Sequence, residues 1–115
     1  MSNLTTHVLD TSQGKPAEGM KVQLFKIEDK KSVQLAEVIT NKDGRVDQKL
    51  LKSENNIGIY ELRFFAGDYF NKENLQFTKI KFLDEITIRF GISDDTHYHV
   101  PLLISPYGYS TYRGS

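Results

Sequence analysis

The chain has 115 residues, of which 38% are hydrophobic and 26% charged, a composition typical of one globular domain spanning residues 1–115. Fifteen basic and fifteen acidic residues cancel, so no net charge favours nucleic acid or an acidic membrane as a partner. The sequence has no cysteine, which excludes disulfides, thiolate nucleophiles and thiolate metal sites.

The N-terminal segment MSNLTTHVLD lacks the basic and apolar regions of a secretory signal. No run of apolar residues is long enough to span a bilayer. We therefore expect a cytoplasmic protein, or a periplasmic one if a signal peptide has been removed.

Apolar residues recur mostly with period two, the spacing that predicts strands. In chain order, the pattern predicts strands over residues 4–9, 21–27, 33–40 and 57–65, a short helix over 66–76, and strands over 86–92 and 97–104. The segment SPYG then suits a type I turn, after which YSTYR can return as a hairpin strand. Seven to eight strands and one short helix predict an all-β fold, an antiparallel β-sandwich.

The predicted strand over residues 97–104 has two faces of different character. One face carries only apolar or aromatic side chains: Tyr98, Val100, Leu102 and Ile104. The other face is half apolar, with histidines at one end: His97, His99, Pro101 and Leu103. We expect the second face to be buried against another subunit, with the histidines in a pocket at that interface.

The chain has three histidines, His7, His97 and His99, and imidazole is the side chain that exchanges protons near neutrality. The i, i+2 spacing places His97 and His99 on one strand face. Three interpretations stay open on spacing alone: surface residues, acid–base groups, or a zinc site with His7 as third ligand.

Arg45 directly follows the Asp43-Gly44 turn, and its guanidinium offers forked donors suited to an oxyanion, an imide or a ureide. A solvated arginine beside a turn is the alternative interpretation, and Arg113 poses the same choice. Gly-rich phosphate loops, paired carboxylates and basic–aromatic signatures of RNA binding are absent from the sequence.

Four segments together resemble the 5-hydroxyisourate hydrolases, the transthyretin-like enzymes of purine degradation. They are LTTHVLDTSQGKPA, TNKDGR, FFAGDYF and HYHVPLLISPYGYSTYRGS, and they reach from residue 4 to residue 115. The terminal YRGS is the most specific element, because the ending of true transthyretins, the hormone carriers with this fold, differs.

The resemblance implies a transthyretin-like sandwich that assembles as a homotetramer, with active sites between subunits and no essential metal or organic cofactor. It implies hydrolysis of 5-hydroxyisourate to 2-oxo-4-hydroxy-4-carboxy-5-ureidoimidazoline. By motif, it makes His7, Arg45 and His99 catalytic residues. Its substrate-binding residues are His7, Arg45, Tyr112 and Ser115, and it assigns no metal ligand.

Without a cysteine or a serine triad, water is the expected nucleophile. We expect His99, alone or with His7, to accept its proton while Arg45 stabilises the developing negative charge. Tyr112 and the Ser115 carboxylate would orient the ring. The rival hypothesis is a non-catalytic, transthyretin-like carrier of an aromatic small molecule.

Overall fold

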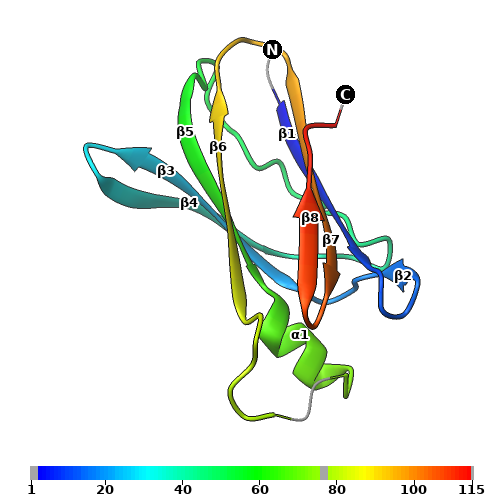
Figure 1. Cartoon of the computed structure of the whole chain (residues 1–115). Helices are drawn as coiled ribbons and strands as arrows, with labels where there is room; N and C mark the ends of the chain where they lie inside the picture. Colours follow the sequence, from blue (N-terminus) through cyan, green and yellow to red (C-terminus); the bar gives the residue numbers. More distant parts are fainter. Residues whose placement is uncertain (1–2, 76–77, 115) are drawn as a thin grey trace.

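Two four-stranded sheets pack face to face in the computed structural model, which describes residues 3–75 and 78–114 (Figure 1). The elements are β1 (Asn3–Asp10), β2 (Lys15–Pro16), β3 (Lys21–Glu28), β4 (Lys31–Ile39), β5 (Gly58–Phe65), α1 (Ala66–Lys72), β6 (Glu85–Ile92), β7 (His97–Ser105) and β8 (Gly108–Thr111). One sheet has the strand order β2-β1-β7-β8 and the other β4-β3-β5-β6. The predicted β-sandwich is confirmed.

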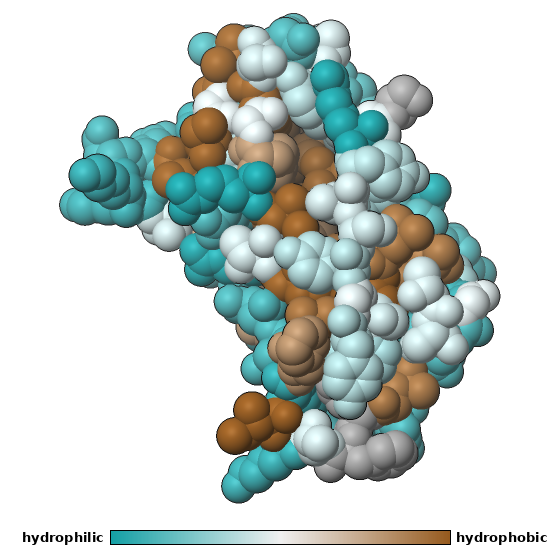
Figure 2. Space-filling view, viewed as in Figure 1, coloured by the Kyte–Doolittle hydropathy of each residue, from teal (hydrophilic) through white to brown (hydrophobic). Residues whose placement is uncertain are grey.

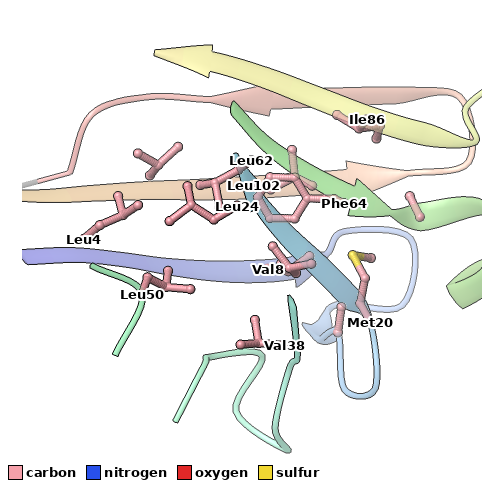
Figure 3. Close-up of a cluster of buried hydrophobic side chains, with 14 of the residues drawn as sticks. Leu4, Val8, Met20, Leu24, Val38, Leu50, Leu62, Phe64, Ile86 and Leu102 are labelled. Atoms are coloured by element: carbon pink, nitrogen blue, oxygen red, sulfur yellow. The ribbon is translucent and has the colours of Figure 1, made fainter. Parts of the chain in front are cut away.

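The core lies between the two sheets, because alternate residues of each strand point inward. Figure 3 shows its centre, where side chains from β1 and β7 meet those from β3, β5 and β6. Fully buried members include Val8, Leu24, Leu62, Phe64 and Leu102. The alternation along β7 is confirmed in the same way, since its four apolar or aromatic positions from Tyr98 to Ile104 are buried.

The helix α1 is shorter than predicted. It ends at Lys72, and Asn74 two residues later has a φ of 56°, a left-handed conformation that stops the helix. The predicted end at Gln76 lies outside the described residues. No helix within the described ranges is long and apolar enough to cross a membrane.

Two features of the sheets differ from the sequence prediction. The two-residue strand β2 lies inside the turn-rich segment DTSQGKPAEG and pairs with the end of β1. More important for the site, β1 and β7 run parallel within the otherwise antiparallel sandwich, and the sequence did not predict which strands pair. The strands β1 and β7 therefore lie side by side (Figure 1). In this register Thr5 is opposite His99, and His7 is opposite Pro101.

Candidate active site

The outer face of the sheet formed by β1, β7 and β8 gathers the predicted site residues. His7 comes from β1 and His99 from β7, as diagonal neighbours across the parallel ladder. Gly114 pairs with His99 beyond the end of β8, and the same register puts Tyr112 opposite Pro101. His7 and His99 are half-buried, whereas Arg45 and Tyr112 are exposed, so the face is open in the single chain.

Arg45 reaches this face because its turn is fastened to β1. The side-chain oxygen of Asn41 accepts hydrogen bonds from the backbone N–H groups of Asp43 and Arg45, at 2.9 and 3.1 Å. The carbonyl of Gly44 accepts a hydrogen bond of 2.9 Å from the N–H of Val8, which docks the turn. The backbone of Arg45 then pairs with that of His7 in an isolated antiparallel β-bridge. The turn therefore holds Arg45 beside His7, near enough for its charge to act on both His7 and His99.

Only glycine fits at position 44 of this turn. Its φ is +73°, and a Cβ there would clash with the carbonyl oxygen of Val8. The Asp43-Gly44 signal in the sequence thus marks a close approach to β1 as well as a turn.

The surroundings of His7 and His99 favour neutral imidazoles. Burial, followed by the charge of Arg45, lowers the pKa of His7, although a hydrogen bond to the backbone of Asp43 opposes the shift. Burial and Arg45 also lower the pKa of His99, and the charges of His7 and His97 add to this effect. A neutral imidazole has a free lone pair, so both rings can accept a proton near neutrality.

Thr5 is a site residue that the sequence analysis missed. Its hydroxyl oxygen Oγ1 lies 2.8 Å from Nδ1 of His99 and 2.9 Å from Nε2 of His97. Alternation along β1 could have placed Thr5 on the same face as His7. The parallel pairing of β1 with β7, which brings Thr5 to both other histidines, has no local signal in the sequence.

Gly114 is the second residue that was missed. Its N–H donates a hydrogen bond of 2.7 Å to the carbonyl of His99. A Cβ at position 114 would lie 2.6 Å from Cδ2 and 3.0 Å from Cβ of His99. The chain end thus packs its backbone directly against the imidazole, which limits where that ring can lie.

Arg113, between these site residues, has a structural position. Its guanidinium stacks 4.0 Å from the centre of the Tyr98 ring and donates a hydrogen bond of 3.0 Å to the hydroxyl of Thr96. Tyr98 belongs to the core face of β7, so Arg113 fastens the chain end from the side opposite His99. Ser115, predicted to bind substrate, lies outside the described residues.

The zinc hypothesis requires a third ligand beside His97 and His99. In the part of the chain that the structure describes, no group of three His, Cys, Asp or Glu side chains could hold a metal ion. What the face does combine is two imidazoles with lowered pKa, a guanidinium and hydroxyl groups. This set can bind an electron-rich ring, take a proton from water and stabilise an oxyanion.

Comparison with known proteins shows which family this chain resembles. Residues 4–114 match the model of the HIUase/Transthyretin family. The chain is 51% identical to a 5-hydroxyisourate hydrolase of Pseudomonas aeruginosa, over 100% of this chain and 93% of that relative.

Solved structures are also similar. The 5-hydroxyisourate hydrolase of Klebsiella pneumoniae superimposes with a TM-score of 0.82 at 38% identity, over 100% of both chains. An (S)-allantoin synthase gives a TM-score of 0.92 at 44% identity, over 99% of this chain and 44% of that one. Sea bream transthyretin, solved with thyroxine, gives a TM-score of 0.86 at 22% identity, over 97% of this chain and 94% of that one, and shares the fold.

Proposed function

Because the chain belongs to the HIUase/Transthyretin family, we propose that it hydrolyses 5-hydroxyisourate in the degradation of urate. Water opens a ring amide bond, and the product is 2-oxo-4-hydroxy-4-carboxy-5-ureidoimidazoline. The proposal depends on one observation: His7, Arg45 and His99 lie at one sheet face, and the backbones of His7 and Arg45 pair in a β-bridge. A carrier that only binds a ring has no need of two imidazoles with lowered pKa beside a guanidinium.

In the proposed mechanism, His99 holds the attacking water and accepts its proton. The lowered pKa of His99 supports this role, since the ring stays neutral near pH 7. His7 and Arg45 bind the carbonyl groups of the substrate, and the guanidinium stabilises negative charge as it develops on the attacked carbonyl oxygen. Tyr112, exposed at the edge of the face, contacts the ring of the bound substrate. No metal or organic cofactor takes part.

The proposal includes assembly into a homotetramer with two sheet faces across each site. A single chain offers the substrate only one wall, from which Arg45 and Tyr112 project into solvent. The apolar part of that wall supports burial against a second copy, since Leu9 and Leu103 remain only half-buried in the single chain. A facing copy would exclude water from the substrate and strengthen the electrostatic contacts of Arg45.

The sheet edges support a second contact between copies. β6 and β8 are terminal strands of their sheets, so each has one side without a ladder partner among the described residues. A groove between them is lined partly by Ile88, Phe90 and Val100. Figure 2 shows apolar side chains gathered along the middle of the molecule in this region. Pairing through these edges, together with packing of the site faces, generates a dimer of dimers.

A direct assay tests the reaction. Urate and a urate oxidase produce 5-hydroxyisourate in place, and its ultraviolet band is followed as the chain is added. We expect the decay to accelerate in proportion to the protein and to stay fast with a chelator. A decay that remains at its spontaneous rate would favour the carrier hypothesis, and loss of activity on chelation would favour zinc.

A further inference from the structure

The hydroxyl of Thr5 connects two histidines, and this connection restricts where their protons lie. Oγ1 is within hydrogen-bond distance of Nδ1 of His99 and Nε2 of His97, at 2.8 and 2.9 Å. A threonine hydroxyl has a single proton and can donate to only one ring. The other ring must donate its own N–H to Oγ1, so the two tautomers are coupled through Thr5.

We infer that Thr5 and His97 form a proton relay behind His99, which moves the positive charge from His99 to His97 as the water attacks and returns it when the leaving nitrogen is protonated. The inference rests on the proposed hydrolysis and adds two residues to it. In the resting arrangement, Nδ1–H of His99 donates to Oγ1 of Thr5, and the Thr5 hydroxyl donates to Nε2 of His97. Nε2 of His99 then carries a lone pair and can face the water.

The relay step conserves every proton. Water gives a proton to Nε2 of His99 as its oxygen bonds to the substrate carbonyl carbon. Nδ1 of His99 gives its proton to Oγ1 of Thr5, and the Thr5 hydroxyl proton passes to Nε2 of His97. His99 and Thr5 end neutral, and the positive charge resides on His97. When the ring C–N bond breaks, Nε2–H of His99 protonates the leaving nitrogen. Nε2 of His97 then returns its proton to Oγ1 of Thr5, and the Thr5 hydroxyl returns one to Nδ1 of His99, which restores the resting arrangement.

The two stages of amide hydrolysis require such a return. Attack removes a proton from the water, and departure of the ring nitrogen consumes one. A positive charge held on His97 between these stages leaves His99 neutral beside Arg45. The carboxylic acid of the product then ionises near neutrality.

The surroundings of His99 disfavour a positive charge on its ring, and the other end of the relay lies in solvent. Arg45 forms a backbone β-bridge with His7, and His7 is in register with Pro101. Pro101 is two residues along β7 from His99 and four from His97, so Arg45 is nearer in register to His99 than to His97. Burial and Arg45 both disfavour a positive charge on His99, as its lowered pKa records. His97 is exposed, at the first residue of β7, where water can solvate the positive charge.

Two substitutions separate a relay from simple positioning of His99. Thr5→Val removes the hydroxyl with little change in shape. His97→Gln keeps an oxygen that can accept a hydrogen bond from Thr5 but cannot take a proton. We expect both variants to lose kcat by about 100-fold with KM nearly unchanged, since acid–base assistance commonly contributes this much. Thr5→Ser keeps the hydroxyl and should restore kcat.

Added imidazole gives a readout that a structural role would not change. It should raise kcat of His97→Gln in proportion to its concentration, because it can accept the proton from Thr5, and should leave the wild-type rate unaltered. Thr6→Val is the matched control: Thr6 neighbours Thr5 on β1, but its hydroxyl donates to the carbonyl of Val100 on the core side. This variant should lose stability and keep kcat.

Nitrogen-15 NMR of labelled histidines tests the arrangement without any turnover. Neutral His99 should carry its proton on Nδ1 in the wild-type chain and lose this preference in Thr5→Val. An active wild-type chain whose Thr5→Val and His97→Gln variants are equally active would overturn the relay alone. Neutral His99 protonated on Nε2 would also overturn it. A wild-type chain that leaves the substrate decay unchanged would overturn the hydrolase assignment instead.

Discussion

Gly114 lies against the imidazole of His99 so closely that a methyl group at position 114 would come within 2.6 Å of Cδ2. The first prediction is therefore that Gly114→Ala displaces the ring. We expect a fall in kcat of about tenfold or more, because small misplacements of a reacting group are costly. Thermal unfolding should change little, since Gly114 is a bridge residue outside β8. Steady-state kinetics and circular dichroism measure the two quantities.

Gly108→Ala is the control for this prediction. Gly108 begins β8 in the same hairpin, and a Cβ there would meet only the hydroxyl of Ser105, at an ordinary 3.8 Å. This variant should keep full activity. Equal kcat in Gly114→Ala and wild type would show that the chain end does not position His99.

Arg45→Lys is the second prediction. The turn would still deliver a positive charge beside His7, but an ammonium cannot reproduce the planar fork of a guanidinium. We expect kcat/KM to fall by about 100-fold, the effect of losing one donor to a developing oxyanion. Arg89→Lys is the matched control, because Arg89 pairs with Glu61 at 2.6 Å on the other sheet. A fully active Arg45→Lys enzyme would show that a point charge suffices.

The period-two pattern of the sequence predicted the strands well, because each strand has one face in the core. It could not predict β2, which is a two-residue pairing made by a turn. It predicted an antiparallel sandwich without saying which strands pair, since sequential strands usually become neighbours through short connections. The parallel pairing of β1 with β7 joins residues more than 90 positions apart, and alternation carries no information on which strands become neighbours.

The same limit explains what could be predicted of the site. Motifs identified His7, Arg45, His99 and Tyr112, and the structure brings them to one face, while their catalytic roles stay predictions. Thr5 was missed because its function depends on the register of β1 against β7. A role for its hydroxyl can be assigned only when the fold has brought the imidazoles of His97 and His99 beside it.

The third prediction concerns assembly. Leu103 lies on the site face of β7 and is only half-buried in the single chain. Leu103→Glu should shift the protein from tetramer towards smaller species, because an unpaired carboxylate in a dry contact is strongly disfavoured. Light scattering across a concentration series measures the change. Ile59→Glu, which places the same charge on the outer face of the second sheet at a residue 46% exposed, should assemble normally.

A wild-type chain that scatters as a 13.2 kDa monomer at micromolar concentration would contradict the proposed tetramer. A tetramer that tolerates Leu103→Glu would instead place the contact elsewhere. The groove between β6 and β8 is then the surface to test, beginning with Phe90→Glu.

The last prediction is the pH dependence of kcat/KM. His99 acts as a base only when neutral, so activity should fall as the pH drops through its pKa. Burial and Arg45 lower that pKa from the ordinary 6.5, so the enzyme should stay active at pH values where a free imidazole is already protonated. Arg45→Gln removes one cause of the shift and leaves burial in place. Its acidic limb should therefore move to higher pH, while its maximal rate falls. Titration of the His99 ring by NMR in both proteins provides an independent measure, and an unchanged pKa in Arg45→Gln would show that the guanidinium does not act on His99.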